Sequence, residues 1–225
     1  MDYKLSFAVN ESIYLKNPES SEVGHSIIKH SIDLINDLGF EHFTFKKLAV
    51  AMNSTEATVY RYFENKHRIL LYIISWYWFY LDYNLDYRLI NLTDRKQRLL
   101  EVLNLLTHEF PESSGGVDYN KKYLNNIVIA ESSKVYLVKE VAEINQHKVF
   151  KPYKDLCSRI AAIISDYDPD YPYPVSLSTT IVETSHSQQF FIKFLPRLTD
   201  QDKIRSNDFV HHFLQDLVFR ILNVN

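Results

Sequence analysis

The chain has 225 residues, of which 46% are hydrophobic and 24% charged, with a formal net charge of −3. This composition is typical of a folded globular protein, and the negative charge argues against a protein that coats nucleic acid without specificity. The single cysteine, Cys157, excludes an internal disulfide and indicates a reducing compartment, so we expect a cytoplasmic protein. No apolar run reaches the roughly 18 residues of a membrane span, and we expect no membrane partner.

Glycine is scarce, with 4 residues in the chain. Tight β-turns draw heavily on glycine, so its scarcity favours helices, and no segment shows the alternation of a strand. We therefore predict an all-α protein. Residues 1–21 lack a regular apolar spacing, and we interpret them as a poorly fixed N-terminal arm.

The next segment, residues 22–66, predicts three short helices. Apolar residues recur at helical spacing between a capping serine at 20 or 21 and Gly39. A second helix starts after Thr44 and stops at Asn53, whose tolerance of the left-handed conformation allows a sharp turn. Thr55 caps a third helix, and we expect its residues Thr58, Tyr60, Arg61 and Tyr62 to point largely outward. Two short helices joined in this way form a helix-turn-helix, whose second helix fits the major groove.

Residues 67–225 predict a helical body. Its helices are expected at about 66–90, 93–110, 119–132, 134–166, 176–195 and 202–222, which makes about nine in all. Pro152 is expected to kink or split the longest of them. The breaks at 111–116 and 168–174 are rich in residues that end helices, and we interpret them as loops within one body.

The segment GFEHFTFKKLAVAMNSTEATVYRYFENKHRIL at 39–70 resembles the head of the tetracycline-repressor (TetR) family of bacterial regulators. The family's markers fall in register on Gly39-Phe40, Thr44, Leu48-Ala49, the run Thr58 to Phe63, and Lys66. The turn departs from the family, because Asn53-Ser54 stands where glycine and an aliphatic residue are common. Residues 70–225 resemble the family only in length and helicity.

The resemblance implies that the three-helix head binds double-stranded operator DNA. Hydroxyls, backbone N–H groups at helix starts and positive side chains are the groups that contact phosphates and base edges. The candidate DNA-binding residues are Thr44, Lys46, Thr55, Glu56, Thr58, Tyr60, Arg61 and Lys66. Glu56 is the ambiguous member, because its carboxylate can accept a hydrogen bond from cytosine N4 or repel phosphates.

The resemblance also implies a dimer and an effector. Two heads on successive major grooves need a homodimer, for which the last two helices supply the apolar seam. Its candidates are Phe190, Phe194, Phe213, Leu217 and Ile221, although such residues also serve an intramolecular core. The body is expected to bind a small-molecule effector that releases a repressor from DNA. The candidate ligand residues are Trp76, Tyr80, His108, Tyr123 and His186, each of which could equally be core.

The sequence also bears on two other classes of protein. An enzyme would need a catalytic or metal-binding constellation, and neither the nine histidines nor Cys157 forms one, so we expect no catalysis, cofactor or metal. The stronger alternative is a helical scaffold or small-molecule-binding protein that has lost specific DNA binding, which Glu56 and the acidic balance would fit.

Overall fold

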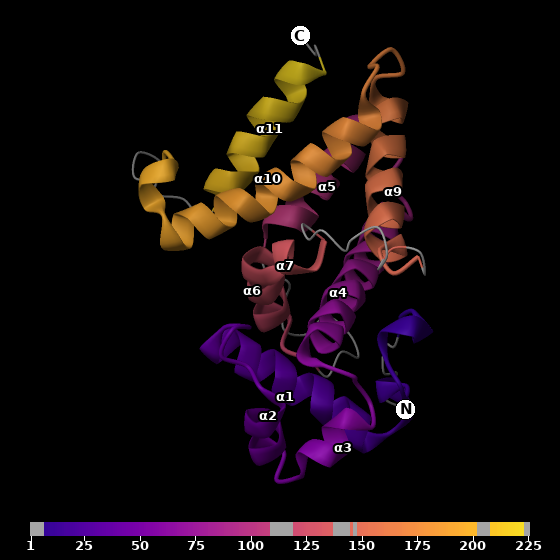
Figure 1. Cartoon of the computed structure of the whole chain (residues 1–225). Helices are drawn as coiled ribbons and strands as arrows, with labels where there is room; N and C mark the ends of the chain where they lie inside the picture. Colours follow the sequence, from indigo (N-terminus) through magenta and orange to yellow (C-terminus); the bar gives the residue numbers. More distant parts are fainter. Residues whose placement is uncertain (1–6, 109–118, 137–144, 146–147, 202–207, 223–225) are drawn as a thin grey trace. The chain divides into compact units, whose positions relative to one another are not determined.

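The computed structural model describes residues 7–108, 119–136, 145, 148–201 and 208–222, which form α-helices and short 3-10 helices without any strand (Figure 1). The all-α prediction is confirmed. The chain divides into two compact units, one made of Met1–Phe79 with Phe110–Lys151 and the other of Tyr80–Glu109 with Pro152–Asn225. No helix among these described residues is long and apolar enough to cross a membrane.

The first unit contains the predicted head and part of the predicted body. Its elements are η1 (Glu11–Ile13), η2 (Pro18–Ser20), α1 (Glu22–Leu38), α2 (Phe45–Ala51), α3 (Glu56–Tyr60), the first half of α4 (Lys66–Leu89), α6 (Lys121–Glu131) and α7 (Ser133–Tyr136). The domain boundaries expected from sequence, at 21 and 66, remain a proposal.

The ends of α1 are fixed by local chemistry. Ser21 Oγ accepts a hydrogen bond from Gly24 N–H at the start of α1, and Gly39 ends it with a φ of 75°. Between these ends, the isoleucines at 27, 28, 32 and 35 face inward and are almost fully buried. Helix α1 packs against η2, α2 and α6.

Helix α4 begins at the head, and its segment from Ile69 to Leu81 is largely apolar on every side. Asn65 Oδ1 accepts a hydrogen bond from Arg68 N–H at its start, and the eight residues from Leu71 to Trp78 are all buried. A helix without a polar face must be covered all round, so this stretch is a central element of the first unit.

The N-terminal arm differs from the sequence expectation. Residues 7–21 form two 3-10 helices with Val9, Ile13 and Pro18 buried, and Leu15 N–H donates to Tyr62 O at 2.7 Å. The expected poorly fixed arm is therefore wrong for this stretch. The residues that hold it lie far away in the sequence, so no local sequence pattern predicts these contacts.

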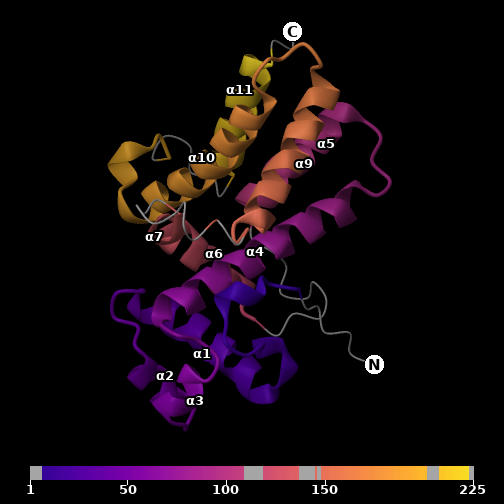
Figure 2. The same cartoon turned by 45° about the vertical axis from the view of Figure 1, so that its right-hand side comes forward.

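The second unit contains the end of α4, α5 (Arg95–Thr107), α9 (Lys151–Tyr167), α10 (Pro174–Phe194), η3 (Pro196–Leu198) and α11 (Phe209–Ile221). Helices α10 and α11 pack against each other and against α5 (Figures 1 and 2). Ser185 Oγ of α10 donates to Leu106 O of α5 at 2.7 Å, and Arg159 of α9 pairs with Asp82 and Asp86 of α4.

One long helix was expected at 134–166, and the described residues contain two separate pieces of it. Helix α9 begins at Lys151, directly after a turn at 148–150 in which Lys148 has a positive φ of 57°, and residues 137–144, 146 and 147 between α7 and this turn lie outside the described part. Pro152 lies at the second position of α9, where its missing N–H removes no helical hydrogen bond. Proline therefore starts a helix here instead of bending one. Residues 202–207, where the last helix was expected to begin, lie outside the described part.

Candidate DNA-binding site

A compact corner of α2 and α3 forms the centre of the candidate site. Thr44 Oγ1 accepts from Lys47 N–H and Thr55 Oγ1 from Thr58 N–H, both at 3.3 Å, so each helix has a side-chain N-cap. Asn53 between them adopts a φ of 49°, and Ser54 N–H donates to Ala49 O at 2.8 Å. The capping threonines and the asparagine turn predicted from sequence are confirmed.

The predicted inner residues of this corner are buried, and most of the predicted DNA contacts are exposed. Leu48, Ala49, Val59 and Phe63 have exposed fractions of 4% or less. The exposed candidates are Thr44, Lys46, Thr55, Glu56, Tyr60 and Arg61, while Thr58 and Lys66 are half-buried. The fold thus brings hydroxyl, carboxylate, phenol and guanidinium groups onto one short helix and its cap.

Tyr60 has a defined orientation despite its exposure. Its ring packs edge-on against Phe45 of α2, with centroids 4.8 Å apart, and the side chain is still 52% exposed. An aromatic side chain held by one face and open on the other loses little further entropy when it meets a ligand. Tyr60 is therefore suited to contact a DNA backbone or base.

Tyr62 was expected to point outward, and this expectation is wrong. Helix α3 ends at Tyr60, so the helical phase does not continue to Tyr62, which is only 3% exposed. Its hydroxyl shares a hydrogen bond with Ser21 Oγ at 2.8 Å. Tyr62 is therefore an internal anchor of the head.

Lys66 has a structural role that the sequence did not predict. Its Nζ donates to the carbonyl oxygens of Phe40 and Glu41, each at 3.1 Å, and lies 4.6 Å from the centroid of the Phe40 ring. The ammonium group ties the start of α4 to the corner that follows α1. Contact with a phosphate remains a proposal for this residue.

The same corner is held from α6 and α7. Phe40 N–H donates to Glu131 Oε1 at 3.1 Å, and Lys134 Nζ pairs with Glu131 at 2.8 Å and with Glu41 at 2.7 Å. Although burial alone would lower the pKa of Lys134, its hydrogen bonds to the two carboxylates outweigh that effect and raise it. Asn126 Nδ2 of α6 adds a hydrogen bond to Asn36 Oδ1 of α1 at 3.0 Å, and the two helices pack together.

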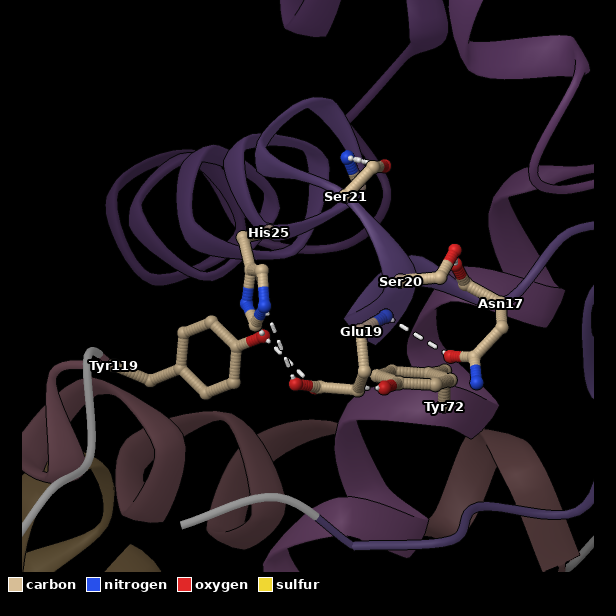
Figure 3. A network of polar contacts seen from close by, with 8 residues as sticks. Asn17, Glu19, Ser20, Ser21, His25, Tyr72 and Tyr119 are labelled. Atoms are coloured by element: carbon tan, nitrogen blue, oxygen red, sulfur yellow. Dashed lines mark hydrogen bonds and ion pairs between the residues drawn. The ribbon is translucent and has the colours of Figure 1, made fainter. Parts of the chain in front are cut away.

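A second polar cluster joins the arm to α1 and α4 (Figure 3). Glu19 Oε1 accepts from the hydroxyls of Tyr72 at 3.0 Å and Tyr119 at 3.2 Å, and His25 Nε2 lies 3.6 Å from Glu19 Oε2. Burial, and next the charge of Glu19, raise the pKa of Tyr72, so its hydroxyl stays protonated as a donor. Sequence reasoning missed this cluster, because its members come from four separate segments.

The ligand-site candidates are divided between the two units. Trp76 and Tyr123 belong to the first unit, where Trp76 is 1% exposed and Tyr123 is half-buried. Tyr80, His108 and His186 belong to the second: Tyr80 and His186 are buried, while His108 is exposed at the end of α5. His108 Nε2 lies 3.1 Å from Asp208 Oδ1, at the surface. Their role in binding an effector remains a proposal.

The dimer candidates lie on α10 and α11. Phe194 and Phe213 are 51% and 37% exposed, and the other three candidates are half-buried. Leu214 and Val218 of α11, and Leu222 directly after it, are buried within the second unit and serve its own core. Apolar side chains beyond those needed for the core therefore remain on the surface of these helices.

These features define a class of protein: a helix-turn-helix head, with two capped helices around a tight turn, on an all-helical body. Residues 27–73 match the family model described as bacterial regulatory proteins of the tetR family. The head of this chain is therefore similar to the heads of the TetR family, as its sequence motifs indicated. No curated protein sequence matches the chain.

Solved structures extend the similarity to the whole fold. The fatty acid degradation regulator FadR from Bacillus halodurans is 15% identical with a TM-score of 0.62, and the match covers 92% of this chain and 96% of FadR. AibR in complex with isovaleryl coenzyme A and operator DNA is 15% identical with a TM-score of 0.58, covering 88% and 97%. The superantigen PfiT is 14% identical with a TM-score of 0.60, covering 93% and 100%. At these identities the likeness shows the fold.

Proposed function

We propose that this chain is a cytoplasmic transcriptional repressor that binds operator DNA as a homodimer and is released by a small-molecule effector. The observation that carries the proposal is the set of exposed polar side chains on α3 and its caps, between Thr55 and Arg61. Val59 on the opposite face of the helix is buried in the core. The exposed groups have the chemistry that reads base edges and phosphates. The match of the head to the TetR family supports the same function.

The test is fluorescence anisotropy on DNA duplexes tiled from the region upstream of the protein's own gene. We expect tight binding to one near-palindromic segment and a fall in affinity of about tenfold or more for Tyr60→Ala, because that variant removes a contact to the DNA and loses only the edge-on contact of the ring with Phe45 from the core. Binding of every duplex with equal affinity would contradict the proposal.

A pair of lysine variants tests the phosphate contacts. Lys46 on α2 and Lys29 on α1 are both exposed, so each alanine variant removes one charge without disturbing the core. We expect Lys46→Ala to weaken binding and to reduce the slope of log affinity against log salt by about 1, whereas Lys29→Ala should leave the slope unchanged. Equal slopes in both variants would remove Lys46 from the interface.

The proposed dimer uses the apolar surface of α10, η3 and α11. Phe194, Leu195 and Leu198 are 51%, 47% and 59% exposed, and Phe213 of α11 is exposed as well. Sedimentation of Phe194→Glu should show a monomer if these residues form the seam, since a buried unpaired charge would oppose association. Ile90→Glu, at a residue that is 69% exposed in the other half of the second unit, is the control and should leave the dimer intact.

An acyl coenzyme A is the first effector class to test, because one structural neighbour was solved with isovaleryl coenzyme A and another is named for fatty acid degradation. Release of operator DNA by short-chain acyl coenzyme A, but not by coenzyme A alone, would support this class. No release by a series of acyl chain lengths would reject it.

The second candidate function is a helical binding protein without an operator. The exposed carboxylate of Glu56 in the first turn of α3 favours it, because a negative charge there repels phosphates. Glu56→Gln discriminates between the two functions. A change in which operator sequence is preferred supports base reading, whereas gain of DNA binding only in the variant supports the second candidate.

A further inference from the structure

Tyr62, the second residue after α3, is held by the arm. Leu15 N–H donates to Tyr62 O at 2.7 Å, Lys16 Nζ lies 5.0 Å from the centroid of the Tyr62 ring, and Ser21 Oγ shares a hydrogen bond with the Tyr62 hydroxyl at 2.8 Å. The main chain, the ring face and the hydroxyl of one residue are thus each contacted by residues 15–21. A side chain fixed at all three points has little freedom to move independently of the arm.

The same arm is fixed to α4 on its other side. The ring of Tyr14 meets that of Tyr72 edge-on with centroids 6.2 Å apart, and Glu19 Oε1 accepts from the Tyr72 hydroxyl at 3.0 Å. Earlier in the arm, Phe7 packs against Trp76 at 5.1 Å and Phe79 at 5.7 Å between centroids. The arm therefore bridges α4 and the end of α3 within one compact unit.

The end of α3 needs such a support. A helix of five residues has little stability of its own, so its direction depends on what it packs against. Val59 fixes its inner face, and Tyr62 N–H donates to Val59 O at 2.9 Å, which transmits the position of Tyr62 to the last turn. A small rotation of this turn would move Tyr60 and Arg61, the exposed candidates next to it.

We propose that residues 14–21 are a positioning element of the DNA reader: they hold Tyr62, set the end of the recognition helix α3 through it, and attach that end to α4 at Tyr72. This inference rests on the proposed function, in which α3 reads the operator. It gives the arm a role in operator selectivity that needs no DNA contact by the arm itself. It also gives α4 a link to α3 besides the chain segment that joins them.

Two variants and one control test the proposal. Tyr62→Phe removes the hydroxyl contact and keeps the ring, and Tyr14→Leu loosens the arm on α4. Tyr77→Phe is the matched control, because the Tyr77 hydroxyl donates to Asn125 Oδ1 at 2.7 Å in the same unit, away from α3. For each, we would measure affinity for operator and for random DNA, with deuterium uptake of peptides covering residues 56–65.

We expect Tyr62→Phe and Tyr14→Leu each to weaken operator binding about fivefold, to leave random-DNA binding unchanged and to speed exchange in 56–65, with smaller than additive effects when combined. Tyr77→Phe should change neither selectivity nor exchange there. The proposal is overturned if Tyr62→Phe keeps operator affinity within twofold of wild type and leaves exchange in 56–65 unchanged. If Tyr62→Phe has these effects and Tyr14→Leu has none, the proposed link of Tyr62 to α4 is overturned. If the wild type itself prefers no duplex, the operator function fails, and exchange still decides whether the arm positions α3.

Discussion

Replacing Glu131 by alanine should destabilise the first unit more than a typical surface change. The carboxylate is 8% exposed, accepts the buried N–H of Phe40 at 3.1 Å and pairs with Lys134 at 2.8 Å. Without it, the Phe40 N–H has lost its acceptor in a buried setting, which costs about 1–3 kcal/mol. Glu131→Gln keeps an oxygen for this N–H and loses only the charge, so its cost should be about 1 kcal/mol.

Urea unfolding followed by circular dichroism at pH 7 measures these free energies. Glu41→Gln is the control, because Glu41 also pairs with Lys134 but is exposed and accepts no buried N–H, so we expect no measurable change. A loss of stability that is largest for Glu131→Ala, smaller for Glu131→Gln and absent for Glu41→Gln indicates a buried acceptor. If Glu131→Ala is as stable as wild type, or if Glu131→Gln is equally damaging, the buried hydrogen bond is not what Glu131 contributes.

Substitutions at three further positions test other parts of the chain. Burial lowers the pKa of His186 from 6.5 to about 4. As the pH falls, the unfolded chain therefore binds the proton before the folded chain does, and the free energy of unfolding should fall by up to about 3 kcal/mol between pH 6.5 and 4. Urea midpoints measured at pH 7 and 4.5 should differ more in the wild type than in His186→Leu. Gly24→Ala should lower the melting temperature, because its Cβ would lie 2.2 Å from Pro18 O. Asn53→Ala should cost about 1 kcal/mol in urea, since alanine tolerates a φ of 49° less well, whereas Asn53→Gly should not.

The head could be predicted from sequence because its signals are local. A capping threonine, an asparagine turn and the apolar spacing of α1 and α2 each act within a few residues, and the structure confirms them. The exposure of Tyr60 followed from the period of a helix.

The remaining features depend on contacts between distant segments. Tyr62 lies beyond the end of α3, where helical periodicity no longer applies, and its partners are in the arm. The carbonyl partners of Lys66 belong to the corner at Phe40, which only the folded chain brings near. The turn before α9 was indicated only by Pro152, as a kink or a split, because the apolar spacing of residues 134–166 continues across it.

The discontinuous first unit has a consequence for the order in which the chain is made. Its core joins Met1–Phe79 to Phe110–Lys151, so the partners of the head corner, Glu131 and Lys134, are translated well after the head itself. Until they leave the ribosome, Phe40 N–H lacks its acceptor, and one side of α1 lacks the cover that α6 provides. The first unit should therefore complete its folding late, when α6 and α7 have been made. An excised head ending at residue 66 would lack these contacts. Nascent fragments that stop short of α6 are the ones to expect in complexes with chaperones.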